Sequence, residues 1–190
     1  MFKIRTMCLD DLFKISLINL DPLTETFTTD FYLEHLITNP DLCLVAEHPH
    51  GDILGYIIAK YDNDPGNSQV KFKCHICAVS VLSNARRIGV ATALVKNVES
   101  IAYLMKAESM SLFVRASNKD AINFYKTHGY RHYKTLKKYY TGENPEDAYD
   151  YRKSLKKPIR ACISVDNDNL YQTAIVDSLL PNRSSFKDTV

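Results

Sequence analysis

The sequence lacks several features that would place the protein in a membrane or outside the cell. No apolar run approaches the roughly 20 residues that a membrane span needs, and no charged start with a long apolar segment forms a secretory leader. The five cysteines are an odd number, and a chain of 190 residues can bury a core without disulfides. We therefore expect a cytoplasmic protein that makes no membrane contact.

An excess of charge of one sign is also missing. The formal net charge is +2 and the pI is near 8.2, whereas a nucleic-acid surface would need a concentrated basic stripe. No repeat or low-complexity tract is present. The content of 45% hydrophobic and 24% charged residues is that of an ordinary globular domain. We expect one domain with a tail and no direct binding of nucleic acid.

Hydrophobic periodicity predicts a mixed α/β domain over residues 1–157. Apolar runs bounded by turn residues indicate strands, and apolar residues three and four apart indicate helices. The expected strands are 2–7, 42–47, 53–59, 70–81, 110–115, 130–140 and 148–155. The expected helices are 9–20, 28–38, 90–105 and 119–128.

The C-terminal segment 158–190 has a different composition. It follows Lys156-Lys157-Pro158, which interrupts the pattern, and it has few aromatic residues for a core. We expect a tail that is either disordered or docks on a partner. A short amphipathic helix over 170–180 is the alternative, with Asp168 as its cap and Pro181 as its stop.

The junction between the strand 70–81 and the helix 90–105 has the composition of a phosphate-binding loop. The first N–H groups of a helix lack intrahelical partners and lie at the positive end of its dipole. Gly89 and Ala91 are small enough for a phosphate group to approach the backbone closely. Arg86, Arg87 and Thr92 supply hydrogen-bond donors for the phosphate oxygens. An ordinary turn with surface arginines is the alternative. No Gly-Lys-Ser or Gly-Lys-Thr follows, so this is not a Walker loop.

Two segments together resemble the GNAT family of acetyltransferases. The loop 86–91 after Val79-Ser80-Val81 resembles that family's acetyl-CoA pyrophosphate loop, and 118–125 followed by Gly129-Tyr130 resembles its Asn-x-x-Ala-x-x-Phe-Tyr segment. The resemblance implies a mixed central sheet flanked by helices, with a splayed strand pair that holds acetyl-CoA. The implied acetyl-CoA-binding residues are Val79, Val81, Arg86, Arg87, Gly89, Val90, Ala91, Thr92, Asn118 and Tyr125.

Further segments resemble the catalytic subunits of NatB-type amino-terminal acetyltransferases. They are 20–27, 47–49, 75–78, 139–140 and 147–153, and the resemblance covers residues 1–155. It implies acetyl transfer, by direct attack in a ternary complex, to the α-amine of N-termini that begin Met-Asp, Met-Glu, Met-Asn or Met-Gln. The implied partners are a large auxiliary subunit and nascent N-termini at the ribosome. The implied substrate-binding residues are Glu25, Phe27, His75, Cys77, Ala78, Tyr139 and Tyr140.

The implied reaction needs no powerful general base. The pKa of an α-amine is about 7.8 and that of a lysine amine is about 10.4. Deprotonation of the α-amine therefore costs roughly 3 to 4 kcal/mol less than deprotonation of the lysine amine. The implied catalytic residues are Tyr125, which would protonate the leaving thiolate, His75 and Asn118. Either His75 or a water held by tyrosines would accept the amine proton. The structural alternatives are a core aromatic for Tyr125 and a semi-buried side chain for His75.

Members of the NatB-type group commonly carry Tyr at the position of Phe27 and Thr at the position of Cys77. A hydroxyl contact to the peptide is therefore absent at both positions. Cys74 and Cys77 form a Cys-x-x-Cys pair, but residues three apart on a strand point to opposite faces and no second pair exists. We therefore expect no metal site.

Two other functions stay open at this stage. One is a GNAT acetyltransferase that acts on other N-termini, on lysine or on a small amine, and the other is a non-catalytic CoA-binding subunit. The dense apolar residues of 9–20 and 31–37 predict a partner surface, with packing on the sheet as the alternative.

Overall fold

The computed structural model describes residues 1–16, 18–20, 25, 27–62, 72–142 and 144–155. The expected tail 158–190 and its alternative helix 170–180 lie outside the described residues, as do the first two residues of the strand expected at 70–81. Within the described part, no helix is both long and apolar enough to cross a membrane.

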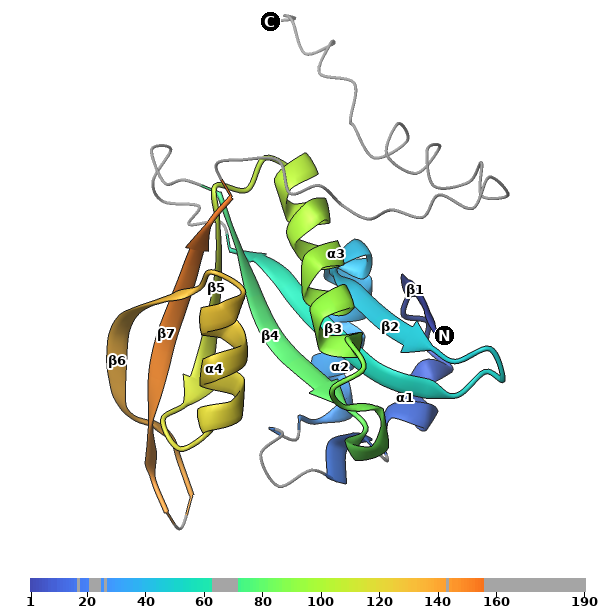
Figure 1. The fold of residues 1–190 in the computed structure, drawn as a ribbon, viewed down its shortest axis with the longest axis horizontal. Helices are drawn as coiled ribbons and strands as arrows, with labels where there is room; N and C mark the ends of the chain where they lie inside the picture. Colours follow the sequence, from blue (N-terminus) through green and yellow to red (C-terminus); the bar gives the residue numbers. More distant parts are fainter. Residues whose placement is uncertain (17, 21–24, 26, 63–71, 143, 156–190) are drawn as a thin grey trace, which may run out of the picture. The chain divides into compact units, whose positions relative to one another are not determined.

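The described strands form one mixed sheet in the order β1-β2-β3-β4-β5-β7-β6 (Figure 1). Neighbouring strands are antiparallel, except that β4 and β5 are parallel. Each expected strand is present, although β3 extends beyond Ala59 to Asp62. The strands are β1 (Lys3–Thr6), β2 (Cys43–Glu47), β3 (Ile53–Asp62), β4 (Lys73–Val81), β5 (Ser109–Arg115), β6 (Arg131–Tyr140) and β7 (Glu146–Ser154).

Three of the four expected helices are confirmed, and the helix expected at 9–20 is wrong. The confirmed helices are α2 (Thr29–Thr38), α3 (Val90–Leu104) and α4 (Lys119–Thr127). In place of one helix, the chain forms α1 (Asp11–Ile15) and a 3₁₀ turn, η1 (Ile18–Leu20). Asn19 explains the break, because its side chain bonds the hydroxyls of Tyr32 and Tyr56 and so holds this turn against the sheet. Two further 3₁₀ turns are η2 (Pro40–Leu42) and η3 (Ser83–Ala85).

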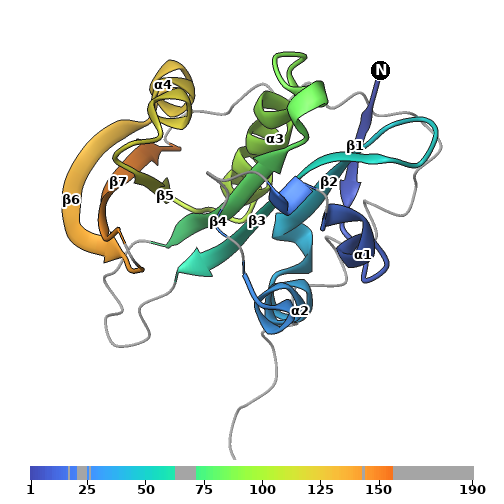
Figure 2. The same ribbon diagram turned by 90° about the horizontal axis from the view of Figure 1, so that it is seen from below.

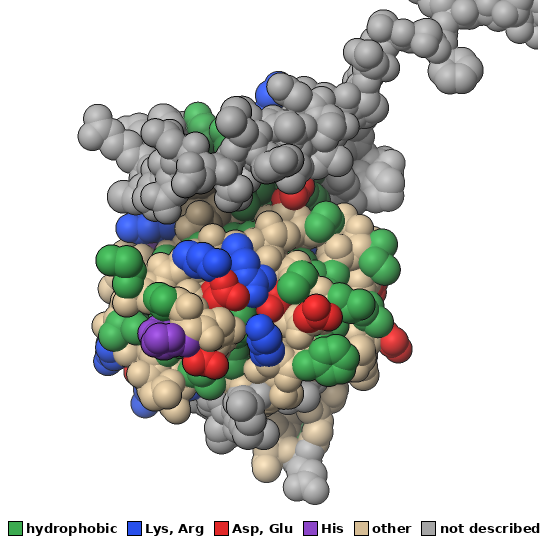
Figure 3. Space-filling view, turned by 90° about the vertical axis from the view of Figure 1, so that its right-hand side faces the viewer, with side chains coloured by type: hydrophobic (Ala, Val, Ile, Leu, Met, Phe, Trp, Pro, Cys, Tyr) green, Lys and Arg blue, Asp and Glu red, His purple; other side chains and the backbone are tan. Residues whose placement is uncertain are grey.

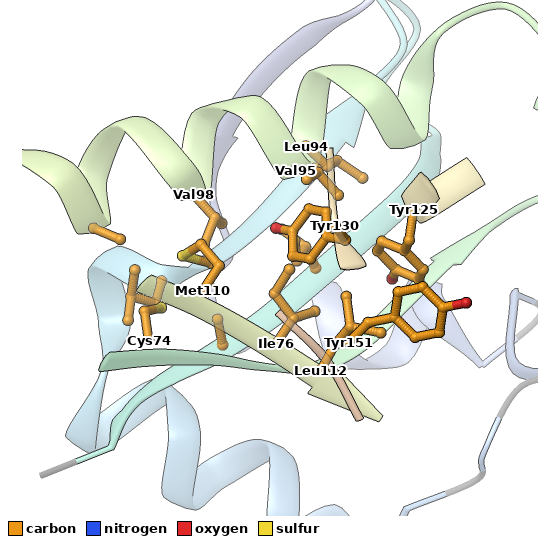
Figure 4. Close-up of a cluster of buried hydrophobic side chains, with 14 of the residues drawn as sticks. Cys74, Ile76, Leu94, Val95, Val98, Met110, Leu112, Tyr125, Tyr130 and Tyr151 are labelled. Atoms are coloured by element: carbon orange, nitrogen blue, oxygen red, sulfur yellow. The ribbon is translucent and has the colours of Figure 1, made fainter. Parts of the chain in front are cut away.

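Helices cover both faces of the sheet, as the GNAT resemblance implies. Helices α3 and α4 lie on one face, and α1 and α2 lie on the other (Figure 2). Side chains of α3, including Leu94 and Val98, pack on Cys74, Ile76 and Met110 of the strands (Figure 4). A second apolar cluster joins α1, η1 and α2 to the opposite face, with buried residues Ile15, Ile18, Tyr32, Val45, Tyr56 and Ile58.

Strands β4 and β5 separate halfway along their length. They pair only as far as Ile76 and Leu112, after which β4 continues beside β3 and β5 continues beside β7. A β-bulge lies at the same point, because Ile58 pairs with Ala78 and Ala59 pairs with Ile76, which leaves Cys77 as the extra residue. A bulge bends its strand and increases the twist, so β4 turns away from β5 here. The expected splayed strand pair is therefore present.

Candidate active site

A pocket of about 110 Å³ opens where β4 and β5 separate. Both strands line it. Asn118, Ala121 and Tyr125 contribute from α4 on one face of the sheet, and Glu25, Phe27 and Tyr140 contribute from elements at the other face. The pocket therefore connects the two faces of the sheet through the gap between the strands.

The pocket brings together only part of the site expected from sequence. Its lining includes the expected residues Glu25, Phe27, Cys77, Ala78, Val79, Asn118, Tyr125 and Tyr140. Other expected residues lie outside the lining: His75, Val81, Arg86, Arg87, Gly89, Val90, Ala91, Thr92 and Tyr139.

The start of α3 has the backbone geometry of an anion site. Arg87 and Gly89 adopt positive φ angles of 64° and 92°, which turn the chain sharply into the helix. The N–H of Ala93 donates to the carbonyl of Gly89 at 2.9 Å, so the amides of the three residues before it precede the helical hydrogen bonds. Thr92 Oγ1 lies 3.1 Å from Nε2 of His128, and this contact links α3 to the end of α4.

A glycine in β3 allows α3 to begin close to the sheet. A Cβ built on Gly55 would lie 2.8 Å from the carbonyl oxygen of Ser80 and 3.1 Å from Cγ1 of Val90. Any side chain at residue 55 would therefore push the first turn of α3 away from β3 and β4. The loop expected to bind pyrophosphate owes its position to this contact as well as to its own residues.

Tyr125 is a buried phenol on the α4 side of the pocket. Its side chain is only 8% exposed, and its ring packs edge to face on Tyr130 with centroids 5.4 Å apart (Figure 4). Burial raises the pKa of Tyr125 well above its ordinary value, so the hydroxyl remains protonated at neutral pH. Asn118 caps α4, because its Oδ1 accepts the N–H of Ala121 at 3.0 Å. Asn118 thus fixes the helix that carries Tyr125.

Arg115 organises the opposite side of the pocket. Its guanidinium donates to Glu25 at 2.7 Å and to Glu146 at 3.4 Å, and it lies 4.0 Å from the ring centroid of Tyr140. One side chain thus ties the segment before α2 to the β6–β7 hairpin. Arg115 is not among the site residues predicted from the sequence, although a cation at the end of an otherwise uncharged strand, three residues before Asn118, was a usable signal.

Aromatic rings form much of the side of the pocket that holds Arg115. Phe27 stacks on Phe31 of α2 with centroids 3.9 Å apart. Phe113, which sequence analysis also missed, lines the pocket and packs on Tyr139 at 5.0 Å. Because alternate residues of β5 face opposite sides of the sheet, Ser111, Phe113 and Arg115 share this face while Leu112 faces α4.

His75 and Cys77 share the face opposite α3 and α4, but their surroundings differ. Nδ1 of His75 lies 2.9 Å from Oγ of Ser111, and burial lowers the pKa of His75 to about 4. Sγ of Cys77 lies 3.5 Å from Nε2 of His35, and burial raises its pKa to about 11. At neutral pH the imidazole of His75 is therefore uncharged, and Cys77 is a thiol.

Cys74 packs in the core cluster under α3, on the other face from Cys77. The described residues contain no group of three His, Cys, Asp or Glu side chains arranged to hold a metal ion.

The sequence of the chain matches the acetyltransferase (GNAT) family over residues 9–130. Together with the splayed strands and the pocket between them, this match shows that the chain belongs to the GNAT acetyltransferase family.

Within that family, the chain is similar to two N-terminal acetyltransferases. It is 38% identical to the N-terminal acetyltransferase B complex catalytic subunit naa20 of Schizosaccharomyces pombe, with 84% of this chain and 89% of that protein covered. It is 41% identical to N-alpha-acetyltransferase 20 of Dictyostelium discoideum, with the same coverage of 84% and 89%.

A solved structure has the same fold. It is Chaetomium thermophilum Naa20 in complex with a bisubstrate analogue, with a TM-score of 0.75, 38% identity, and coverage of 84% of this chain and 93% of that one.

Proposed function

We propose that this chain transfers the acetyl group of acetyl-CoA to the α-amine of protein N-termini that begin Met-Asp, Met-Glu, Met-Asn or Met-Gln. It does so in the cytoplasm, on chains that leave the ribosome, as the catalytic subunit of a complex. The observation that carries the proposal is the pocket that passes between β4 and β5, because it lets two substrates meet from opposite faces of the sheet. Similarity to N-terminal acetyltransferases supports the choice of an α-amine.

The acetyl-CoA side is the face covered by α3 and α4. The backbone amides at the start of α3 would bind the pyrophosphate, with Arg86 and Arg87 as further donors. The exposed edge of β4 beyond Ile76 leaves the backbone of Val79 and Val81 free of β5, so the pantetheine arm can pair there. The pantetheine arm would thus run along β4 from the start of α3 to Tyr125, where the thioester would lie.

The chemistry joins the amine nitrogen to the acetyl carbon and breaks the carbon–sulfur bond. Tyr125 is a protonated donor in the pocket and would give its proton to the departing thiolate, and the proton that the amine nitrogen loses would pass through solvent to the Tyr125 oxygen. Glu25 is the one carboxylate among the described lining residues, and its Oε2 already accepts a hydrogen bond from Arg115 at 2.7 Å. A lining with no other carboxylate favours an α-amine, which is partly neutral at physiological pH, over a lysine amine.

The peptide side is the face with Glu25, Phe27, Tyr139 and Tyr140. Phe27 and Phe31 offer an apolar surface suited to a methionine side chain. His75 lies at the edge of this side with an uncharged imidazole, so it would act as a hydrogen-bond partner for the second side chain of the substrate.

The partner is a larger auxiliary subunit, and exposed apolar side chains near α1 and α2 support this assignment. Ile15 and Tyr32 are buried on the sheet, but Leu9, Phe13 and Ile37 are exposed by 58%, 82% and 80%. Figure 3 shows hydrophobic side chains at the surface around a cluster of acidic and basic ones on this side of the molecule. Large apolar side chains exposed on neighbouring elements support a partner surface here.

The test of the function is a panel of short peptides with acetyl-CoA. Peptides that begin Met-Asp or Met-Glu should be acetylated far faster than peptides that begin Ser or Ala, and a peptide with a blocked N-terminus and an internal lysine should not react. Equal rates across the panel would rule out the proposal.

The test of the partner compares the chain alone with the chain and its auxiliary subunit. We expect Phe13→Ser to weaken the complex, whereas Leu104→Ser at the end of α3, which also replaces an exposed side chain, should leave it intact. Full activity of the isolated monomer, unchanged by the partner, would contradict the assignment.

A further inference from the structure

Beside the pocket, one face of the sheet has no helix over it among the described residues, and we call this area the open face (Figure 2). Helices α1 and α2 lie against the strands on the β1 side, and no described helix lies on that face over β5, β7 and β6 (Figure 2). Phe113, which lines the pocket, is at the boundary of this open area. A substrate chain that leaves the pocket on the peptide side would therefore meet this part of the sheet.

The register shows which side chains share the open face. Residues directly opposite in an antiparallel pair point to the same side of the sheet. Phe113 pairs with Asp150, and Asp150 pairs with Lys134. One row of side chains therefore runs from the pocket wall outward to Lys134 on the edge strand.

A second row lies parallel to the first. Ser111 pairs with Arg152, and Arg152 pairs with Arg131. Tyr133 is the extra residue of a bulge between these rows, and its ring lies 3.6 Å from the guanidinium carbon of Arg152. The open face thus carries three cations on two neighbouring strands.

Within the two rows, three cations accompany one carboxylate, that of Asp150. Asp150 is 1% exposed and accepts the hydrogen bonds of Arg152, so it neutralises that guanidinium but is itself covered. The side chains of Arg131 and Lys134 are exposed, and the structure gives neither an ion pair within the described residues. Among the described residues of the two rows, Arg131 and Lys134 are thus the exposed charges, and both are positive.

Distances along the sheet relate these cations to positions in a substrate. Neighbouring strands are about 4.8 Å apart, so Lys134 lies about 10 Å from Phe113 across the sheet, while an extended peptide advances about 3.3 Å per residue. If the first two substrate residues occupy the pocket, then the third to sixth residues come within reach of Arg152, Lys134 and Arg131.

We propose that this open face is a subsite for the substrate chain beyond its second residue, and that it favours acidic side chains at positions three to six. The proposal rests on the proposed function, because it takes the pocket as the site of the N-terminal amine. Exposed charges act mainly on encounter and binding, so the effect falls on kcat/KM rather than on turnover at saturation.

The test uses peptides of about ten residues that share Met-Asp and differ only at positions four to six, with all Glu, all Gln or all Lys. The full chain in complex with its auxiliary subunit is assayed at saturating acetyl-CoA. We expect kcat/KM to fall in the order Glu, Gln, Lys, with about three- to tenfold between the extremes, since several exposed pairs each contribute modestly. At about 0.5 M salt, where the Debye length is only about 4 Å, the difference should shrink to less than about twofold.

Paired charge reversals locate the effect. Arg131→Glu with Lys134→Glu should remove or invert the order, whereas Lys96→Glu with Lys126→Glu, the same change in net charge on α3 and α4, should preserve it. A Met-Asp dipeptide amide, which ends before the subsite, should react equally with both double variants, which shows that they are folded.

The outcomes separate this proposal from the function on which it rests. If the Met-Asp dipeptide amide is not acetylated at all, the proposed function fails. If it is acetylated but the charge series is flat, only the subsite is overturned. Loss of binding to a single-stranded RNA oligonucleotide in the Arg131→Glu, Lys134→Glu variant, together with a flat peptide series, would also overturn the subsite and assign the surface to nucleic acid.

Discussion

The two sides of the pocket are built in different ways. Apart from Asn118 and Tyr125, the proposed acetyl-CoA side comes from one continuous stretch, 79–92, and its proposed binding groups are backbone amides at the start of α3. The peptide side comes from side chains far apart in the sequence, such as Glu25 and Arg115, which lie 90 residues apart and are joined by one ion pair of 2.7 Å.

This difference predicts how each side responds to mutation. Backbone amides stay in place as long as the chain keeps its local conformation, so the acetyl-CoA side should be sensitive to glycine replacement and tolerant of most other changes. Side chains held by non-local contacts depend on several elements at once. The peptide side should therefore be sensitive to changes at distant supporting residues.

The largest expected effect lies between the two sides, at Tyr125. Tyr125→Phe should lower kcat about 100-fold and leave both KM values within about twofold, because general acid catalysis acts in the transition state. Steady-state kinetics with each substrate varied would measure this. The matched control is Tyr130→Phe, which removes a neighbouring buried hydroxyl that is outside the pocket lining. A change confined to KM would reduce Tyr125 to a binding role.

The next effect isolates the acetyl-CoA side. Gly89→Val should raise the KM for acetyl-CoA by at least about tenfold, because a β-branched residue strongly disfavours the φ of 92° and would move the amides at the start of α3. The KM for peptide should change little.

Gly51 provides the control for backbone strain. It has a φ of 90° in the β2–β3 turn, and a Cβ there also meets nothing within 4 Å. Gly51→Val should reduce stability without a selective effect on acetyl-CoA. Equal KM values for acetyl-CoA in the two variants would refute the placement of the pyrophosphate.

The next largest effect is expected on the peptide side, as a rise in the KM for peptide. Arg115→Met should raise the KM for peptide about five- to tenfold, because it releases both Glu25 and Glu146 and leaves Tyr140 without its cation. Acetyl-CoA binding, measured by calorimetry, should be unchanged.

Arg5→Met is the matched control for Arg115→Met. Arg5 also joins two carboxylates, those of Asp11 and Glu47, but it does so away from the pocket. A selective loss of peptide affinity in both variants would show that the effect is one of general stability.

The same contrast explains what the sequence could predict. Periodicity located every strand of the described residues and three of their helices, and the 86–91 and 118–125 segments identified the family, because these signals are local. The cap made by Asn118 is also local. Arg115 and Phe113 were missed because their roles depend on partners from other elements that no spacing reveals. The break in the helix 9–20 was missed for the same reason, since it depends on Tyr32 and Tyr56.

The smallest effect tests whether the peptide side depends on a buried polar network behind it. Tyr56 is fully buried and donates to Oδ1 of Asn19 at 2.6 Å, while Nδ2 of Asn19 donates to Tyr32, whose ring packs on Phe27 of the pocket.

Tyr56→Phe leaves the Asn19 oxygen without this donor, so we expect a loss of about 1 to 2 kcal/mol in the free energy of unfolding. Phe27, which packs on Tyr32, should then be held less firmly, with a roughly two- to threefold rise in peptide KM and no change for acetyl-CoA. Tyr61→Phe on the same strand is the control, because the buried hydroxyl of Tyr61 has no hydrogen-bond partner within the described residues. Denaturant unfolding and the two KM values together decide the matter: a loss of stability without the rise in peptide KM would mean that the network supports the fold but not the substrate side.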